Sequence, residues 1–327
     1  MAKYGLMFIS AITPLNNGSG EGLGIVDNPV IRERTTQFPI IQSSSIKGVL
    51  RDKFGEDASP EVRVLFGPPS GQGDSHAGAV CISDAQIIAF PIRSLKGAFV
   101  WATSPLTLYR FWRNVEMSGF NSTFPKLKNL IDKINSSFNN LDSVVLCPSG
   151  KNYLEISSKI ILEEFPKTIR NSPDLASLLE NFAKEIGLKI FTPVDTFLKD
   201  EFEKKLVLLT EDSFRYFVSN ATEIMPNIKI NEKGTTEKGS LRYTEFLPSE
   251  TILYSLMSYE NPKLPVDEPD VLKKIENIEI KKSDNSVWKF ESKDVFVEAL
   301  FEQKIPDIIQ VGSDETTGKG IVKLKLI

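Results

Sequence analysis

A glycine-rich segment near the start of the chain carries a single acid and leads into a run of serines. Four alternate glycines lie between Gly18 and Gly24, Asp27 follows them, and the serines occupy positions 43–45. Glycine lets backbone N–H groups approach an anion closely, and a helix start capped by serine offers further N–H groups with partial positive charge. The pattern predicts a binding surface for a polyanion with one carboxylate beside it. A surface loop followed by an ordinary capped helix is the alternative interpretation.

Basic residues accompany this segment and the helix that the serines begin. Residues 43–54 place apolar side chains on one helical face and Lys47 and Arg51 on another. These two cations are four residues apart, so they are neighbours on the helix surface, where like charges weaken an isolated helix slightly. Arg32 and Arg34 add positive charge nearby. We therefore expect basic side chains here to bind phosphate groups.

The composition is that of a folded protein with a sizeable core. The chain has 327 residues, 41% hydrophobic and 25% charged, enough for two average domains or one domain with large insertions. Its net charge of −4 argues against nucleic-acid binding by bulk electrostatics but leaves room for a basic groove. No apolar run reaches the roughly 20 residues that span a bilayer, and the N-terminus lacks a secretory cleavage pattern.

Cysteine and histidine are too few for several common chemistries. Cys81 and Cys147 show neither a disulfide pattern nor metal-ligand spacing, which is typical of the reducing cytoplasm. His76, the single histidine, lies in a turn rich in glycine and serine. One histidine cannot supply a zinc site of ordinary composition, and a Ser-His-Asp triad would have to use this residue. We expect a cytoplasmic protein in which His76 is a solvated loop residue.

Strands and helices are predicted to alternate without a parallel βαβ rhythm, which indicates the α+β class. One helix is expected to begin at Pro105, with Thr103 or Ser104 as its cap. The expected strands cover 6–13, 78–92, 99–103, 287–290, 308–311 and 320–327, and the other expected helices cover 43–54, 249–257 and 292–301.

Two stretches suggest how the chain is divided. Between 119 and 205 the composition shifts toward Asn, Ser and Lys with several short helical patterns, which predicts a mainly helical insertion. That insertion is expected to pack on a core made of residues 1–118 and 206–327. Residues 206–248 alternate as strands do and contain a glycine turn near 233–239, which predicts a long hairpin.

Two motifs resemble known catalytic signatures but depart from them. The segment 312–320, GSDETTGKG, has five residues between its first two glycines and a glycine after its lysine, so it is not a nucleotide P-loop. Ser44-x-x-Lys47 and the Ser-Asp-Asn at 283–285 match two of three signatures of serine β-lactamases, but the Lys-Thr-Gly signature is missing. A serine hydrolase therefore remains a weak alternative.

Six separated motifs occur in one order along the chain. They are GSGEGLGIVDNPVIRE, SSSIKGVLRD, SDAQIIAFPIRSLKGAFVWATSPLTLYRF, ATEIMPNIKI, GSLRYTEFLP and the closing GSDETTGKG. Together they closely resemble the backbone subunits of the Cmr effectors, the type III-B CRISPR complexes, within the RAMP superfamily. The resemblance runs nearly end to end and is weakest across 120–205.

This resemblance implies a ferredoxin-like (RRM-like) core with large insertions and a protruding β-hairpin thumb. It also implies copies that stack as a helical filament on one guide crRNA, beside other Cmr subunits and without a membrane. Each thumb would interrupt the duplex between the guide and a single-stranded target RNA. The acid of the glycine-rich loop would then cut the target once per subunit with a divalent metal ion, Mg²⁺ or Mn²⁺.

The resemblance assigns roles to particular positions of this chain. Asp27 falls on the catalytic, metal-binding acid. The positions that fall on the guide-binding helix start and on the terminal glycine-rich loop are Ser43, Ser44, Ser45, Lys47, Arg51, Gly312, Thr316, Thr317, Gly318 and Lys319. The thumb positions are Thr222, Glu223, Ile224 and Met225. Hydroxyls, helix-start amides and cations bind phosphates without distinguishing bases, as a carrier of arbitrary guides requires. Ile224 or Met225 is suited to wedge between bases, or to form hairpin core.

One departure from the family pattern bears on the chemistry. Family members often carry histidine in the run TPLHVGSG, whereas this chain has Asn16 in TPLNNGSG. Cleavage would then rest on Asp27 and a metal ion, with the 2′-hydroxyl of the target as nucleophile. A lone carboxylate recruits Mg²⁺ weakly and needs RNA phosphate as a further ligand. A purely structural RNA-binding subunit, in which Asp27 is silent or a simple turn residue, is the alternative function.

Overall fold

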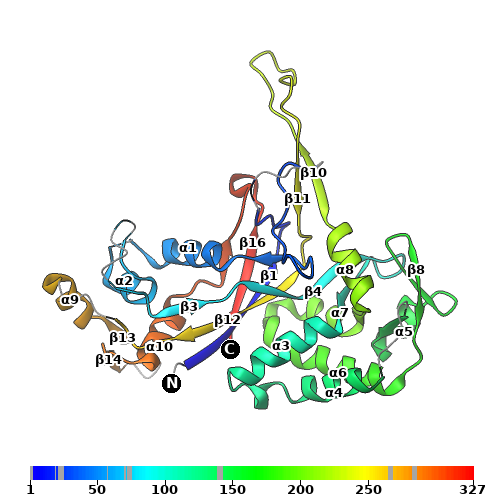
Figure 1. The fold of residues 1–327 in the computed structure, drawn as a ribbon, viewed down its shortest axis with the longest axis horizontal. Helices are drawn as coiled ribbons and strands as arrows, with labels where there is room; N and C mark the ends of the chain where they lie inside the picture. The colour runs from blue at the N-terminus through cyan, green and yellow to red at the C-terminus, as the bar shows by residue number, and fades with distance from the viewer. Residues whose placement is uncertain are drawn as a thin grey trace.

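The computed structural model of the chain describes residues 3–18, 20, 26–56, 58–69, 71, 76–137, 143–263, 268–281 and 286–327. Most of the strands join one large mixed sheet (Figure 1). They are β1 (Lys3–Ala11), β2 (Ile40–Ile41), β3 (Val80–Ile82), β4 (Ala85–Arg93), β5 (Phe99–Thr103), β6 (Ser143–Leu146), β7 (Lys159–Leu162), β8 (Phe165–Ile169), β9 (Leu206–Leu208), β12 (Ile252–Tyr259), β15 (Ile308–Gln310) and β16 (Ile321–Leu326). The predicted α+β class is confirmed.

The order of the strands places β1 inside the sheet, third from one end of the path. The path is β15-β16-β1-β12-β4-β5-β9-β6-β8-β7, with β2 beside β4 and β3 beside β12. The neighbours β16, β1, β12 and β4 are all antiparallel. Residues 119–205 contribute β6, β7 and β8, which extend the same sheet beyond β9.

Alternate side chains of β1 enter two separate cores, one on each face of the sheet. Leu6 and Phe8 belong to one buried cluster, and Met7 and Ile9 belong to the other. Successive side chains of a strand point to opposite faces, so a central strand covered on both faces is apolar throughout. This explains why the run starting at residue 6 has no polar face.

The helices divide between these two cores. The first core contains buried residues of α1 (Ser43–Phe54), α2 (Pro60–Phe66), α8 (Glu211–Asn220), α9 (Pro269–Glu276) and α10 (Asp294–Lys304). The second contains buried residues of α3 (Pro105–Met117), α4 (Pro125–Ser137), α6 (Pro173–Ile190) and α7 (Thr196–Lys205). The short α5 (Pro148–Leu154) packs beside α6 and α7. Two small strands, β13 (Glu279–Lys281) and β14 (Val287–Lys289), pair near α10.

A hairpin projects from the body of the molecule (Figure 1). Its strands are β10 (Glu223–Asn227) and β11 (Arg242–Phe246), which pair antiparallel from Glu223 with Phe246 to Asn227 with Arg242. We call residues 223–246 the hairpin arm. Because α8 leads directly into β10, the arm rises from the end of a helix that is anchored in the first core.

Several sequence predictions agree with the structure. The helix at 43–54 and the strand at 99–103 have the predicted bounds. Of the two candidate caps for the next helix, Ser104 is the one used, and its side chain accepts a hydrogen bond from the N–H of Thr107. The strands near 6–13, 287–290, 308–311 and 320–327 and the helix near 292–301 are also present.

Other predictions were wrong. The helix expected at 249–257 is the strand β12, which lies between β1 and β4 and is buried on both sides. A short apolar run does not distinguish a buried strand from a buried helix, because neither shows a polar face. The strand expected at 78–92 is divided into β3 and β4. Residues 206–248 were expected to form alternating strands throughout, but the part from Glu211 to Asn220 is the helix α8.

His76 also differs from its predicted environment. The side chain is only 9% exposed, and its Nε2 lies 3.2 Å from the carbonyl oxygen of Arg63. His76 is therefore buried against α2 rather than solvated. Cys81 and Cys147 are both free. Within the described part of the chain, no helix is both long and apolar enough to cross a membrane.

Candidate nucleic-acid interface

Asp27 lies against the base of the hairpin arm. Its N–H donates to the carbonyl oxygen of Tyr243 at 3.0 Å, and the N–H of Tyr243 donates to Asp27 Oδ2 at 2.7 Å. Asn28, the next residue, forms a parallel bridge with Thr244. The acid itself is exposed. Strand β11 therefore sets the position of Asp27, although more than two hundred residues separate them in the chain.

A hollow of about 730 Å³ opens beside this acid. It is lined by Gly20, Asp27, Asn28, Asn227, Arg242, Thr244 and Asp314. These residues come from the glycine-rich segment, from both strands of the arm and from the terminal glycine loop. The two glycine-rich motifs of the sequence thus meet at one site, which is open and polar.

The arm contributes one of its two faces to the hollow. Asn227 and Arg242 are directly paired across the strands, so their side chains share a face, and Thr244 follows on that face two residues later. Asn227 Nδ2 donates to Thr244 Oγ1 at 3.2 Å. Sequence reasoning missed these three residues and Asp314. The alternation along β11 predicts that 242 and 244 share a face, but it does not say which face meets Asp27.

The two apolar thumb candidates lie on opposite faces of the arm. Met225 pairs with Thr244 and therefore shares the face that contributes to the hollow, whereas Ile224 pairs with Glu245. Ile224 is 54% exposed and Met225 is partly buried. Burial raises the pKa of Glu223 at the arm base, and the nearby Lys319 opposes this shift.

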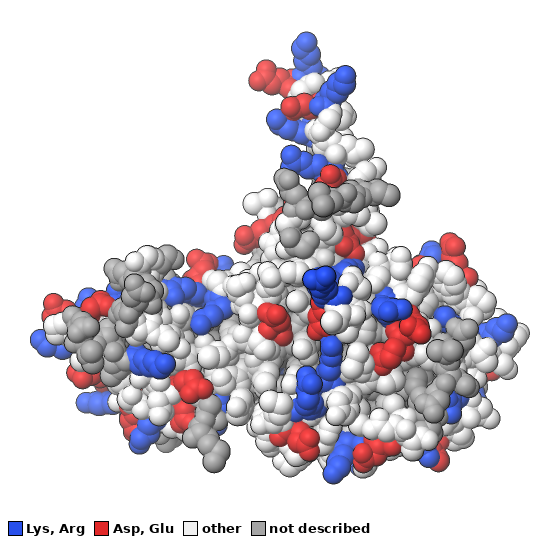
Figure 2. Space-filling model, in the orientation of Figure 1, with Lys and Arg blue, Asp and Glu red and all other residues white. Residues whose placement is uncertain are grey.

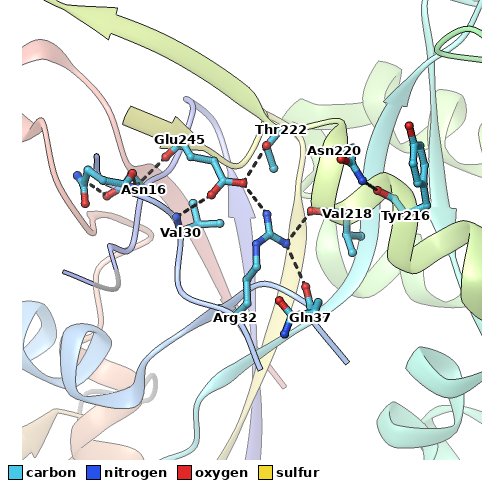
Figure 3. Close-up of polar contacts among 10 residues, drawn as sticks. Asn16, Val30, Arg32, Gln37, Tyr216, Val218, Asn220, Thr222 and Glu245 are labelled. Atoms are coloured by element: carbon cyan, nitrogen blue, oxygen red, sulfur yellow. Dashed lines mark hydrogen bonds and ion pairs between the residues drawn. The ribbon is translucent and has the colours of Figure 1, made fainter. Parts of the chain in front are cut away.

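A buried ion pair ties the arm to the body, as Figure 3 shows. Arg32 Nη2 and Glu245 Oε1 are 2.6 Å apart, and their side chains are 14% and 9% exposed. Glu245 also accepts hydrogen bonds from Thr222 Oγ1 at 2.9 Å and from the N–H of Val30 at 2.9 Å. Arg32 further donates to the carbonyl oxygens of Gln37 and Val218. The prediction that Arg32 serves phosphate was wrong, because its guanidinium is used inside the protein.

Asn16 joins the segments around the acid. The side chain is fully buried, and its Nδ2 donates to the carbonyl oxygens of Asn28 at 3.2 Å and Glu245 at 2.7 Å (Figure 3). Its Oδ1 accepts from Asn28 Nδ2 at 3.2 Å and from Ser313 Oγ at 2.8 Å. A carboxamide offers two donors and one acceptor oxygen with two lone pairs, so all four bonding positions are used.

We call the place where Asn16 joins the acid segment at Asn28, strand β11 at Glu245 and the terminal loop the junction. The terminal glycine loop packs against it. A Cβ at Gly312, whose φ is +96°, would lie 1.9 Å from the carbonyl oxygen of Asn16, so only glycine fits there. Thr316 is exposed, and the exposed Thr317 donates its hydroxyl to the carbonyl oxygen of Asp314. Lys319 Nζ lies 5.2 Å from the centre of the Phe246 ring at the arm base. Gly318 has a φ of +78° and open space around it.

The start of α1 carries an acid that the sequence analysis did not anticipate. The N–H of Ser43 donates to Asp84 Oδ1 at 2.8 Å, while the N–H of Ser45 donates to the carbonyl oxygen of Gln42. Ser44 is exposed. The predicted serine cap was wrong, because Gln42 is the N-cap residue and its side chain makes no capping hydrogen bond. The N–H of Ser43 is already occupied by the carboxylate of Asp84.

The two cations of α1 turn toward the protein itself. Lys47 Nζ donates to the carbonyl oxygen of Val80 at 3.2 Å, and Arg51 donates to the carbonyl oxygens of Phe66 at 3.3 Å and Pro68 at 2.8 Å. Burial lowers the pKa of Lys47, and the charge of Arg51 lowers it further. Both side chains are partly buried rather than fully extended into solvent.

Comparison with known proteins identifies the family. The family model described as the RAMP superfamily matches residues 8–323. The chain belongs to the RAMP superfamily. It is 33% identical to the CRISPR system Cmr endoribonuclease Cmr4 of Pyrococcus furiosus over 328 aligned residues, which cover 99% of this chain and 96% of that protein. The predicted family is confirmed.

Solved structures share this fold. A crystal structure of oligomeric Cmr4 from Pyrococcus furiosus matches with a TM-score of 0.64 and 26% identity, covering 100% of this chain and 98% of the other. A cryo-EM structure of the type III-B Cmr-beta complex bound to cognate target RNA contains a chain that matches with a TM-score of 0.69 and 21% identity, covering 99% and 96%. At that identity the second match concerns the fold alone.

Among the residues that the structure describes in this RAMP protein, no group of three or more His, Cys, Asp or Glu side chains could hold a metal ion. Two carboxylates, Asp27 and Asp314, nevertheless line the same hollow. Magnesium is commonly bound by one or two carboxylates together with substrate phosphates and waters. The donor set therefore fits a metal ion only when an RNA phosphate completes it.

The hydrolase alternative gains nothing from the structure. Lys47 donates to the carbonyl oxygen of Val80, and Ser44 belongs to the exposed start of α1. The Ser-Asp-Asn at 283–285 lies outside the described residues.

Proposed function

We propose that this protein is a guide-binding backbone subunit of a type III-B Cmr effector, and that it cleaves target RNA complementary to the guide. The single observation that carries the proposal is the position of Asp27, which lies in an open polar hollow between the hairpin arm and the terminal glycine loop. The 33% identity to the Cmr4 endoribonuclease over 99% of the chain supports the same activity.

In this proposal the core is ferredoxin-like and the hairpin arm acts as the thumb. The order β16-β1-β12-β4, with every neighbouring pair antiparallel and with α1 and α10 in the same core, supports the first assignment. The arm projects far beyond the body in Figure 1, which supports the second. Met225 is the better wedge candidate, because it shares the arm face of Arg242 and Thr244.

The guide would bind by its phosphates along α1 and the terminal loop. The exposed Ser44 and Thr316, the open Gly318 and the two cations of α1 are the groups available for this contact. Lys47 and Arg51 already donate to carbonyl oxygens of the protein, so they are expected to serve mainly by charge. Figure 2 shows further Lys and Arg side chains along the arm, with acids among them.

Cleavage would use the 2′-hydroxyl of the target as nucleophile. Its oxygen attacks the adjacent phosphorus, the 5′-oxygen of the next nucleotide leaves, and the products carry a 2′,3′-cyclic phosphate and a 5′-hydroxyl. Asp27 would take the proton from the 2′-hydroxyl, and Arg242 would face the charge that develops on the phosphate. A divalent ion held by Asp27, Asp314 and RNA phosphate would add Lewis-acid stabilisation of that charge.

Reconstitution of the complex with guide RNA, partner subunits and a labelled complementary target tests this function. We expect regularly spaced products that disappear in Asp27→Asn while assembly and guide binding persist. A target with a single 2′-deoxy substitution at one cut position should lose that cut alone. An intact target in the presence of normal assembly would instead support the structural subunit without nuclease activity.

The requirement for a metal ion is tested in the same assay. Chelation should stop cleavage, and added Mg²⁺ or Mn²⁺ should restore it, whereas target binding should persist throughout. Cleavage at an unchanged rate after complete chelation would overturn the proposal of a metal ion and leave the role of Asp27 as a base intact.

A further inference from the structure

The residue that replaces the family histidine has a well-defined place in this structure. Asn16 is 0% exposed, so it cannot touch RNA in the hollow. Its four hydrogen bonds reach three segments that are far apart in the chain: the acid segment at Asn28, strand β11 at Glu245 and the terminal loop at Ser313. These are the segments that surround the hollow.

Asn16 and Asp27 are both hydrogen-bonded to strand β11. Asp27 is joined to β11 at Tyr243, by one bond to its carboxylate and one from its own N–H. Asn16 clamps the next residue, Asn28, to the same strand two residues further on, at Glu245. The backbone of β11 completes the clamp, because the N–H of Glu245 donates to the carbonyl oxygen of Asn28 at 3.1 Å.

The surroundings leave little room for another arrangement of Asn16. A Cβ at Gly18 would lie 2.6 Å from Asn28 Oδ1 and 3.2 Å from Asn16 Oδ1. A Cβ at Gly312 would lie 1.9 Å from the carbonyl oxygen of Asn16. Two glycines from opposite ends of the chain are thus needed to enclose this asparagine. The close packing of these two glycines therefore depends on the position of Asn16.

We propose that Asn16 is a positioning residue for cleavage, which fixes Asp27 relative to the arm and the terminal loop through its buried carboxamide. This inference rests on the proposed cleavage by Asp27. A displacement of about 1 Å in a catalytic group can reduce a rate about 100-fold, so loss of this clamp is expected to lower the rate without removing the acid. Asn16 bonds the terminal loop at Ser313 and not at Thr316 or Gly318, and it makes no hydrogen bond to the guide-binding groups of α1, so guide affinity should stay constant.

Three variants test the role, and their order is informative. In Asn16→Ala we expect the cleavage rate at saturating target to fall by about 10- to 100-fold, with guide and target affinity unchanged. In Asn16→Asp, which keeps the shape, we expect a larger loss, because a carboxylate would face the carbonyl oxygens of Asn28 and Glu245 without donors. Asn17→Ala is the matched control, since Asn17 is also buried and its Nδ2 has no hydrogen-bond partner among the described residues.

The outcomes separate this inference from the proposed function. Wild-type cleavage that Asp27→Asn abolishes, together with a normal rate in folded Asn16→Ala, would overturn the positioning role alone. An Asn16→Asp variant more active than Asn16→Ala would show that Asn16 acts by filling space, and it would also overturn the role. An equal fall in rate and guide affinity, or an equal loss in Asn17→Ala, would indicate general damage to the fold and count against it.

A milder variant keeps the test available where Asn16→Ala does not fold. Ser313→Ala removes only the bond to Asn16 Oδ1 and leaves the carboxamide in place. We expect a fall in rate of a few-fold in the same assay, with normal thermal unfolding. An unchanged rate in a folded Ser313→Ala protein would contradict the role of this clamp.

Discussion

The junction beside Asp27 and the start of α1 both carry motifs that stand out in the sequence, but their polar side chains differ in burial and in bonding. At the junction of the acid segment, the arm and the terminal loop, Asn16 and Glu245 are buried and Arg32 is 14% exposed, and the three join distant segments by hydrogen bonds. At α1, Lys47 and Arg51 lie at a partly exposed surface and donate to nearby carbonyl oxygens. The first region is a fixed frame for an acid, and the second is an adaptable charged surface. Polar residues near a site therefore serve either geometry or charge, and burial distinguishes the two.

The largest effect on stability is expected from Glu245→Ala. The variant leaves Arg32 buried without its acid, and breaking a buried pair by removing one partner costs about 3–5 kcal/mol in the free energy of unfolding. Urea titration would measure it. Glu237→Ala on the same arm is the control, because its ion pair with Lys229 has side-chain exposures of 47% and 73%. Such exposed pairs contribute about 0–1 kcal/mol. Equal losses in the two variants would show that the buried network does not anchor the arm.

A second comparison lies within the terminal loop. Gly312→Ala should destabilise the protein by about 2–3 kcal/mol, because the new methyl group would clash with the carbonyl oxygen of Asn16 in a left-handed backbone. Gly318→Ala has a similar φ but open space, so backbone strain alone should cost about 1 kcal/mol. Thermal unfolding of both variants provides the measurement. A Gly318→Ala variant as unstable as Gly312→Ala would mean that strain, rather than contact with the junction, determines the loop.

The smallest effect is expected at α1. Replacing Lys47 and Arg51 by alanine should weaken guide binding about equally for all guide sequences. The slope of the logarithm of the binding constant against the logarithm of salt concentration should become less steep by at most about 2. The measurement is guide affinity at several salt concentrations. Lys126→Ala with Lys128→Ala removes the same charge from α4, on the other face of the sheet, and should change little. A loss that depends on the guide sequence would argue for base recognition.

Local patterns were enough to locate the elements that begin with clear end signals. The start at Pro105 follows from the capping Ser104 and the proline at the first helical position, whereas the bounds 43–54 follow from an amphipathic pattern without a capping side chain. The strand β12 was mistaken for a helix because its neighbours β1 and β4 bury both of its faces. That burial depends on strand order, which a local window of sequence does not contain.

For the site, the sequence by itself determined which residues carry chemistry: the acid at 27 among glycines, the serines at 43–45 and the glycines of 312–320. Only the tertiary structure decided which of them meet. It brought Asp27 to Tyr243 and Arg242, turned Arg32 inward to Glu245 and gave Asn16 its buried clamp. The physical reason is that residue type and local backbone set what a side chain can bind, whereas its partner depends on long-range strand pairing that closes the sheet.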